Sequence, residues 1–175
     1  TWALWQQQQK DLDEQDLRKI HGIECRCIRT LHRMMVRGVK VDEERLKNVT
    51  HIINKRLDKA MEVLPDNINL RSSTQMKKLF DDNGIVDYPM TEKGNPSFAE
   101  AWLLTTELGK RVVAARKYGN LLNSFIIPMQ THLHKGRIHT DFNQSRSDQY
   151  GTVTGRLSSS RPNMQQVPKR NEELG

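Results

Sequence analysis

The densest run of hydrogen-bonding and basic side chains in this chain lies between residues 137 and 170. Its short polar side chains are interrupted by arginine and lysine, and Gly155 allows the backbone to approach a partner closely. The guanidinium of Arg156 suits the acceptors of the minor groove, which differ little between A·T and T·A pairs. Lys169 and Arg170 supply a salt-sensitive attraction to phosphate. We therefore expect this segment to contact a nucleic-acid duplex without reading its sequence.

The overall charge also favours a polyanionic partner. The 175 residues carry 28 Lys and Arg against 21 Asp and Glu, which gives a formal net charge of +7. No apolar run approaches the roughly 18 residues of a membrane-spanning helix, and no secretory signal pattern is present. The mean hydropathy of −0.75 favours an elongated helical segment that packs against another part of a protein. We expect nucleic acid as the partner and no membrane.

Apolar spacing predicts an α+β fold, mainly α with a small β portion. The predicted helices cover residues 17–38, 42–64, 72–84, 98–108 and 110–133. We expect the first two to pack antiparallel. Ser72 and Gln75 have the spacing of a capping box at the start of the third, and the last is expected to bend at Gly119 and Pro128.

Strands are expected after Gly136. Ile138, Thr140 and Phe142 alternate with polar residues, as in a half-buried strand, and residues 152–154 have the same character. The long antiparallel helices are therefore followed by a second layer that contains the first strands.

Two groups of ionisable residues invite a metal-binding or catalytic interpretation that their context does not favour. His132, His134 and His139 lie close together in the sequence, but no cysteine accompanies them and a change from helix to strand separates them. Asp141 and the two glutamates near the C-terminus are interpreted as solvated surface charges. We predict no metal site and no catalytic residue in this chain.

The cysteines and the first residues bear on the setting of the chain. Cys25 and Cys27 are one residue apart on a predicted helix and point to different faces, so no disulfide is expected and a reducing, cytoplasmic setting fits. Residues 1–5 read as the interior of a helix, so we expect the chain to continue from a preceding segment.

The segment Arg137–Arg170 resembles family A DNA polymerases, the bacterial polymerase I type. The palm of that family opens with R-x-H-x-x-F-N-Q, followed by T-G-R-L-S-S-S-x-P-N-L-Q-N-I-P-x-R, and the match here is nearly residue by residue. Upstream, residues 38–42 resemble the family's G-V-x-V-D turn, residues 69–75 its thumb-tip N-L-x-S-x-x-Q, and residues 91–97 its T-K-T-G-x-x-S loop. The opening residues are similar to the helix that follows the last acidic motif of the family's proofreading domain.

The resemblance implies three parts: residues 1–11 end an exonuclease-like domain, residues 12–134 form the helical thumb, and residues 135–175 begin the palm. The chain would stop before the strand that brings the first metal-binding aspartate. Mg²⁺ is therefore expected as the cofactor of the complete enzyme, with its ligands outside this chain, and the chain alone is expected to be inactive.

The resemblance also implies DNA-contacting side chains. The expected contacts are Asn69, Ser72, Ser97 and Arg116 in the thumb, and Asn143, Gln144, Thr154, Arg156, Ser158, Ser159, Asn163, Gln166, Lys169 and Arg170 in the palm. Gln166 stands where the family usually has Asn, and Asn120 and Leu122 stand where relatives carry lysines. Arg71 and Lys117 are candidates to compensate.

The implied function is that of a piece of a template-directed DNA polymerase, a nucleotidyltransferase, from a bacterium or a bacteriophage. It would bind and position primer-template DNA, while deoxynucleoside triphosphates would bind through the remainder of the polymerase. Two alternatives stay open: a stand-alone, non-catalytic helical DNA-binding module, and one half of a naturally split polymerase. A single-subunit RNA polymerase is disfavoured, because its palm is not introduced by this T-G-R-L-S-S-S series.

Overall fold

The computed structural model describes residues 1–144 and 156–168. The chain divides into two compact units. The central unit is Glu43–Pro128, and the flanking unit joins Thr1–Asp42 to the chain from Met129 onward. Helices dominate the described residues and the strands are short, so the predicted α+β fold with a small β portion is confirmed. The domain boundaries expected after residues 11 and 134 stay a prediction.

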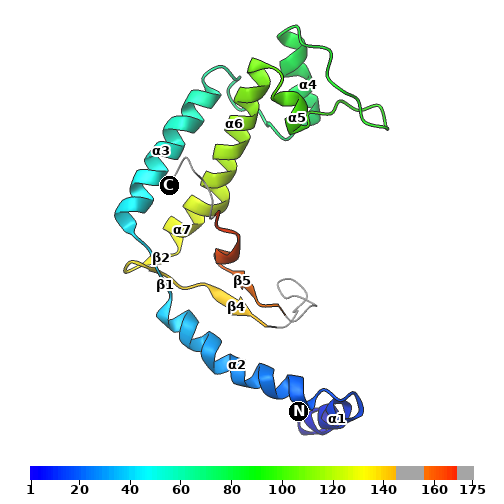
Figure 1. The fold of residues 1–175 in the computed structure, drawn as a ribbon, viewed down its shortest axis with the longest axis vertical. Helices are drawn as coiled ribbons and strands as arrows, with labels where there is room; N and C mark the ends of the chain where they lie inside the picture. Colours follow the sequence, from blue (N-terminus) through cyan, green and yellow to red (C-terminus); the bar gives the residue numbers. More distant parts are fainter. Residues whose placement is uncertain (145–155, 169–175) are drawn as a thin grey trace. The chain divides into compact units, whose positions relative to one another are not determined.

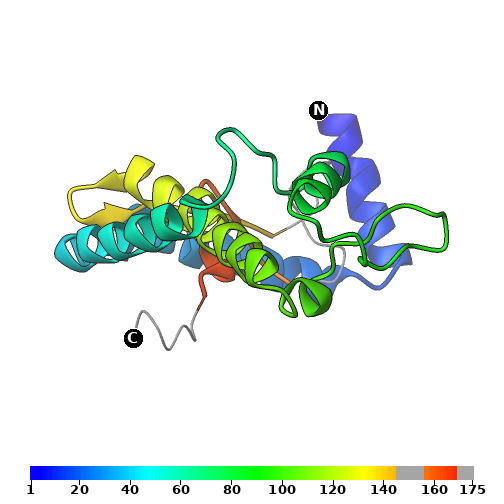
Figure 2. The ribbon, with the colours of Figure 1, turned by 90° about the horizontal axis from the view of Figure 1, so that it is seen from above.

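Two antiparallel helices form the body of the central unit. Helices α3 (Glu43–Met61) and α6 (Glu107–Leu121) run side by side in opposite directions (Figure 1; Figure 2). Arg111 on α6 donates from Nη1 to the backbone oxygen of Lys59 on α3 at 3.0 Å. The predicted antiparallel pair is therefore present, but its members differ from the prediction.

The expected pairing of residues 17–38 with residues 42–64 is wrong. The first of these segments is α2 (Arg18–Arg37), which belongs to the flanking unit, whereas α3 packs along α6. The link between α2 and α3 contains a short strand, β1 (Val39–Lys40), that pairs with a distant part of the chain. It is therefore not the turn of a helical hairpin.

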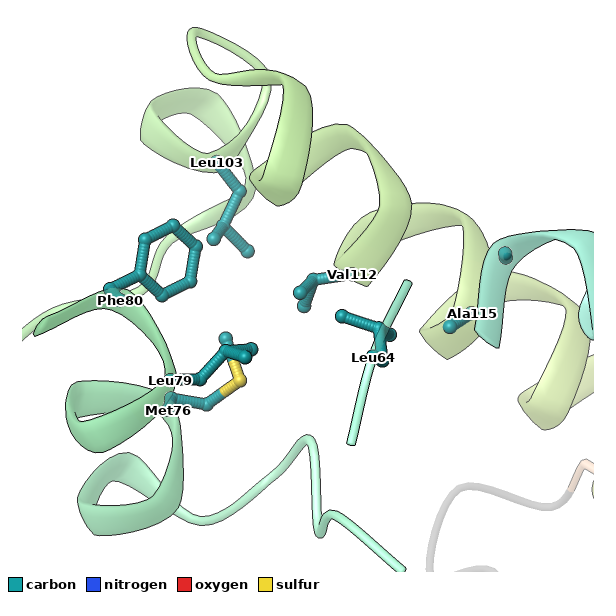
Figure 3. Packing of buried hydrophobic residues seen from close by; sticks show 8 residues of the cluster. Leu64, Met76, Leu79, Phe80, Leu103, Val112 and Ala115 are labelled. Carbon is teal, nitrogen blue, oxygen red and sulfur yellow. The ribbon is translucent and has the colours of Figure 1, made fainter. Parts of the chain in front are cut away.

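The core of the central unit lies where two short helices meet the N-terminal half of α6 (Figure 3). These helices are α4 (Ser73–Asp82) and α5 (Glu100–Leu103). The side chains with no exposed surface are Met76, Phe80, Leu103 and Val112. The ring centroid of Phe80 lies 5.3 Å from that of Phe98 and 5.1 Å from that of Trp102. Burial of each large side chain contributes about 1.5–3 kcal/mol, which fixes α4 and α5 against α6.

Side-chain caps set the helix starts in this unit. The Ser72 hydroxyl accepts from the backbone N–H of Gln75, as predicted, at 3.4 Å. The Gln75 side chain does not return to Ser72 but accepts from the backbone N–H of Asn69 at 2.6 Å. Thr106 caps α6 by accepting from the N–H of Gly109 at 3.0 Å. This second cap interrupts the helix expected over residues 98–108, because the cap residue itself must be extended.

The long helix expected over residues 110–133 is irregular near its end. After α6 the chain forms a π turn, η1 (Leu122–Ile126), and then α7 (Ile127–Thr131). Pro128 has no N–H, and its ring crowds the carbonyl four residues earlier, at Ser124. A π turn opens the backbone at that place, so the irregularity falls between the predicted positions Gly119 and Pro128.

The flanking unit begins with two helices, α1 (Trp2–Glu14) and α2. The turn between them is closed by Arg18, which donates to both carboxylate oxygens of Asp13 at 2.6 Å and to the backbone oxygen of Gln9 at 3.0 Å. Helix α2 ends at Gly38, whose φ of 66° is one that L side chains rarely adopt. The helix predicted over residues 17–38 is confirmed.

A three-stranded sheet then joins distant parts of the flanking unit. Its strands are β1, β2 (Leu133–His134) and β3 (Arg137–Ile138), in the order β1-β3-β2, with all neighbours antiparallel. Val39 lies opposite Ile138. The helix predicted to reach Leu133 is too long, because β2 and β3 form a hairpin whose turn residues, Lys135 and Gly136, have φ of 48° and 73°.

A second, two-stranded sheet ends the described part of the chain. Strand β4 (Asp141–Asn143) pairs antiparallel with β5 (Ser158–Ser160), and a 3₁₀ turn, η2 (Met164–Gln166), follows. The strand expected over residues 152–154 lies outside the described residues. Within residues 1–144 and 156–168, no helix is long and apolar enough to cross a membrane.

Candidate nucleic-acid interface

The first group of predicted contacts lies on the turn that precedes α4, residues 66–72, here called the tip turn. Asn69 organises this turn: its side-chain oxygen accepts from the N–H of Arg71 at 3.0 Å, and its backbone oxygen accepts from the N–H of Ser72 at 2.9 Å. Asn69 and Arg71 are exposed, while Ser72 is half-buried and caps α4. The turn therefore presents an amide and a guanidinium to solvent.

Arg116 on α6 holds the tip turn in place. Its Nε and Nη2 donate to the backbone oxygen of Leu70 at 2.9 and 2.6 Å, and its Nη1 donates to the backbone oxygen of Phe98 at 3.3 Å. Burial, and then the nearby charge of Arg71, lowers the pKa of Arg116 from its ordinary value. The guanidinium is thus half-buried and ties two loops to one helix.

Ser97 lies in the second of these loops. Its backbone N–H donates to the oxygen of Pro89 at 2.7 Å, and it is half-buried next to Phe98, one of the acceptors of Arg116. Leu70 and Phe98 directly follow Asn69 and Ser97 in the sequence. Arg116 therefore connects the two segments that carry these predicted contacts. The structure brings all four predicted thumb contacts into one region.

Two adjoining hollows lie beside the tip turn, and together they are called the tip groove. They measure about 370 and 460 Å³ and share Arg71, Arg116 and Asn120 in their walls. Lys117 and Glu100 line the larger hollow. The lining thus combines three cationic side chains, Arg71, Arg116 and Lys117, with the carboxylate of Glu100, an arrangement that favours an anion.

In the flanking unit, two predicted contacts bind other protein groups. Gln144 donates from Nε2 to the backbone oxygen of Glu24 at 3.0 Å and to its carboxylate at 2.6 Å. Asn143 on β4 donates to the hydroxyl of Ser160 on β5 at 3.1 Å. Both side chains are half-buried, and they fasten β4 to α2 and to β5.

Ser159 is buried, with 5% of its surface exposed, as is Thr140 with 2%. Their hydroxyl oxygens lie 2.8 Å apart, the Thr140 hydroxyl donates to the backbone oxygen of Pro162 at 2.7 Å, and Ser159 accepts from the N–H of Met164 at 3.0 Å. This chain of hydrogen bonds holds β5 and the turn after it against β4. The Ser159 hydroxyl is therefore used inside the fold.

The remaining described candidates lie at the surface after β5 or next to it. Arg156, Asn163 and Gln166 are exposed, and Ser158 is half-buried. Asn163 caps η2 by accepting from the N–H of Gln165 at 3.0 Å. Three further predicted contacts, Thr154, Lys169 and Arg170, lie outside the described residues.

Several residues that organise this region were not predicted from the sequence. Arg137 donates to the backbone oxygens of Arg37 and Gly38 at 3.2 Å, and Nδ1 of His139 lies 2.8 Å from the backbone oxygen of Met35. These partners are about a hundred residues apart, so no local spacing pattern reveals them. Alternation at Ile138 and Phe142 indicated an extended chain, which the structure divides into β3 and β4 of two different sheets.

Within the described ranges, no group of three or more His, Cys, Asp or Glu side chains could hold a metal ion. Asp141, the carboxylate nearest the predicted contacts of β4, pairs with Arg161 at 2.7 Å. Mg²⁺ in the complete enzyme, with its ligands outside this chain, stays a prediction.

The chain matches a family model described as DNA polymerase family A over residues 40–174. It is 28% identical to DNA polymerase DpoZ of Acinetobacter phage SH-Ab 15497, over 99% of this chain and 32% of the phage protein. It is 31% identical to the thermostable DNA polymerase I of Thermus filiformis, over 81% of this chain and 18% of that protein.

A solved structure is also similar. The POL domain of Pol1 from M. smegmatis, in complex with DNA primer-template and dNTP, aligns with a TM-score of 0.64 and 29% sequence identity, over 83% of this chain and 27% of that one. The chain thus spans about a third or less of the length of these relatives.

Proposed function

Because this chain belongs to the family A DNA polymerases, we propose that it binds and positions primer-template duplex for a template-directed DNA polymerase. The observation that carries the proposal is the tip turn, which Arg116 fixes beside a groove lined by three cations. A fixed backbone with projecting basic and amide groups suits the repeating phosphates of a duplex. The similar POL domain was solved with a DNA primer-template, which supports the same partner.

The predicted contacts divide by what their side chains do in the fold. The proposed duplex contacts are Asn69, Ser72, Ser97, Arg156, Ser158, Asn163 and Gln166, whose side chains are exposed or half-buried. Thr154 is a proposed contact on the family resemblance, and Lys169 and Arg170 are proposed on that resemblance and on their charge. Arg116, Asn143, Gln144 and Ser159 hold separate segments of the fold together, and we assign them to positioning.

The division of labour follows from this assignment. Residues 12–134 would act as the thumb that holds the duplex, and residues 135–175 as the first part of the palm near the primer end. Deoxynucleoside triphosphates and Mg²⁺ would bind through the remainder of the polymerase, where the ion would supply charge stabilisation to nucleotide transfer. The 175-residue chain contributes orientation and should not extend a primer by itself.

The test is fluorescence anisotropy of the 175-residue chain with a labelled primer-template, with single-stranded DNA as the competitor, across a salt series. We expect duplex to be preferred regardless of sequence, with affinity that falls as salt rises, and we expect Arg156→Ala to weaken binding. Arg161→Ala is the matched control, because Arg161 is also an exposed arginine close to β5 and is not among the proposed contacts. Equal affinity for duplex and single strand would refute the proposal.

A further inference from the structure

We propose that Arg71 and Lys117 bind backbone phosphates of the duplex in the tip groove, and that Arg116 positions them without contacting DNA itself. This inference rests on the proposed function. It adds which side chains contact the phosphates of the duplex and which side chain positions them. It departs from the simple expectation that Arg116, as the arginine matched to the family, is itself a DNA contact.

The geometry of Arg116 carries the first step. Three of the five N–H groups of its guanidinium donate to two backbone oxygens, those of Leu70 and Phe98. Moving the Arg116 guanidinium out to a phosphate would break these bonds and leave two half-buried carbonyls without this partner, which costs more than the exchange of a surface contact. Arg116 is therefore a fixed part of the groove wall.

Arg71 is the cation that this arrangement presents. Its backbone N–H is held by the side chain of Asn69, and its preceding residue is held by Arg116, so the position of its Cα is set from both sides. The side chain itself is exposed. Because the charges of Arg71 and Arg116 repel each other, an anion bound at Arg71 relieves an unfavourable interaction already present in the fold.

Lys117 supplies the second cation from α6. It is exposed, its Nζ lies 5.7 Å from the ring centroid of Tyr118, and it lines the same hollow as Arg71. Glu100 is the carboxylate in that lining, against three cationic side chains, so the net charge of the wall is positive. The Ser124 hydroxyl donates to the side-chain oxygen of Asn120 at 3.0 Å, which orients a neutral amide in the wall shared by both hollows. Cations with a neutral amide suit a phosphodiester.

The experiment measures how the affinity for primer-template depends on salt, for the 175-residue chain and its single variants. Arg71→Gln and Lys117→Gln should each lower the slope of log affinity against log salt by about one, because each removes one phosphate contact. Lys110→Gln is the matched control: it lies on the same helix, pairs with Glu107, and lines neither hollow, so its slope should equal that of the wild type.

Arg116→Lys tests the positioning role, because it keeps the charge but cannot hold two carbonyls with a planar fork. We expect this variant to bind DNA more weakly, and we expect Arg71→Gln to add little further loss in its background, since Arg116 acts through Arg71. Circular dichroism of each variant separates this effect from loss of folding. Wild-type affinity for Arg116→Lys, or fully additive losses, would overturn the positioning role.

A scan of duplexes with single uncharged methylphosphonate linkages locates the contact. One or two positions should weaken the wild type and leave Arg71→Gln or Lys117→Gln unaffected. If the wild type binds duplex but both glutamine variants keep its slope, the tip-groove inference is refuted and the proposed function stands. If the wild type shows no preference for duplex, the proposed function fails and the inference fails with it.

Discussion

Replacing Gly109 with alanine should destabilise the central unit, although alanine is the better helix former by about 1 kcal/mol. Gly109 lies in the first turn of α6, behind the cap that Thr106 provides. A Cβ built there would lie 2.0 Å from the backbone oxygen of Leu103 and 2.7 Å from the Thr106 hydroxyl. Ordinary carbon–oxygen contacts are about 3.3 Å or longer, so the turn between α5 and α6 would have to move by about 1 Å.

The size of the expected loss in stability depends on which atoms the new Cβ would meet. The nearest atom belongs to the backbone and not to the end of a flexible side chain, and Leu103 itself is fully buried in the core. Overpacking of this kind costs about 1–3 kcal/mol, and a contact this short belongs at the upper end. After the gain in helix propensity, we expect a net loss of about 2 kcal/mol in the free energy of unfolding.

The matched control lies on the same helix. A Cβ at Gly119 would meet nothing within 4 Å, so Gly119→Ala should stabilise the protein by about 0.5–1 kcal/mol. Urea unfolding followed by circular dichroism measures both variants. Gly109→Ala with an unfolding midpoint equal to or above that of the wild type would refute the reasoning.

Four other changes test different parts of the structure. Phe80→Ala should lower the free energy of unfolding by about 3–5 kcal/mol, because it empties the fully buried centre of the core; a loss below about 1 kcal/mol in urea unfolding would contradict that burial. Ser72→Ala should cost about 1 kcal/mol in the same assay through loss of the α4 cap, whereas Ser72→Asp, which keeps a capping oxygen, should cost little. Thr140→Val should cost about 1–3 kcal/mol, because two buried polar groups lose their partner, and Thr140→Ser should retain most of the stability. Asp81→Asn should matter less as the pH falls: the hydrogen bond from Lys77 lowers the pKa of Asp81 below its ordinary 3.8, so its contribution is present above that pH and lost as the pH falls through the folded-state pKa. Thermal melting between about pH 7 and about pH 2 should show the two proteins converge, and a constant difference would contradict the pairing.

Local signals in the sequence predicted the local structure well. The end of α2 followed from Gly38, whose positive φ ends the helix, and the start of α4 followed from Ser72, whose hydroxyl caps it. Residues 158–160 carried no strand signal, because three serines give no alternation of apolar and polar residues. They form β5 through pairing with β4, in which Ser159 lies opposite Phe142.

The candidate site was less accessible to prediction from sequence. The family resemblance implied Arg116 as a DNA contact, but its acceptors at Leu70 and Phe98 lie 46 and 18 residues away in the sequence. The resemblance likewise implied Ser159 as a DNA contact, yet its hydroxyl is buried against Thr140. Whether a polar group faces solvent or another protein group depends on tertiary packing, which local spacing does not contain.

The sheet of the flanking unit has a consequence for the order of folding during synthesis. Its strand β1 leaves the ribosome long before β3, and the whole of the central unit is made between them. The central unit is continuous in sequence, so it can form its core while the sheet still lacks its partner strand. Before it folds, the central unit is a long flexible loop between β1 and β3, and closing such a loop costs entropy that grows with its length. Folding of the central unit removes most of that flexibility. A variant that slows folding of the central unit should therefore also delay the pairing of Val39 with Ile138.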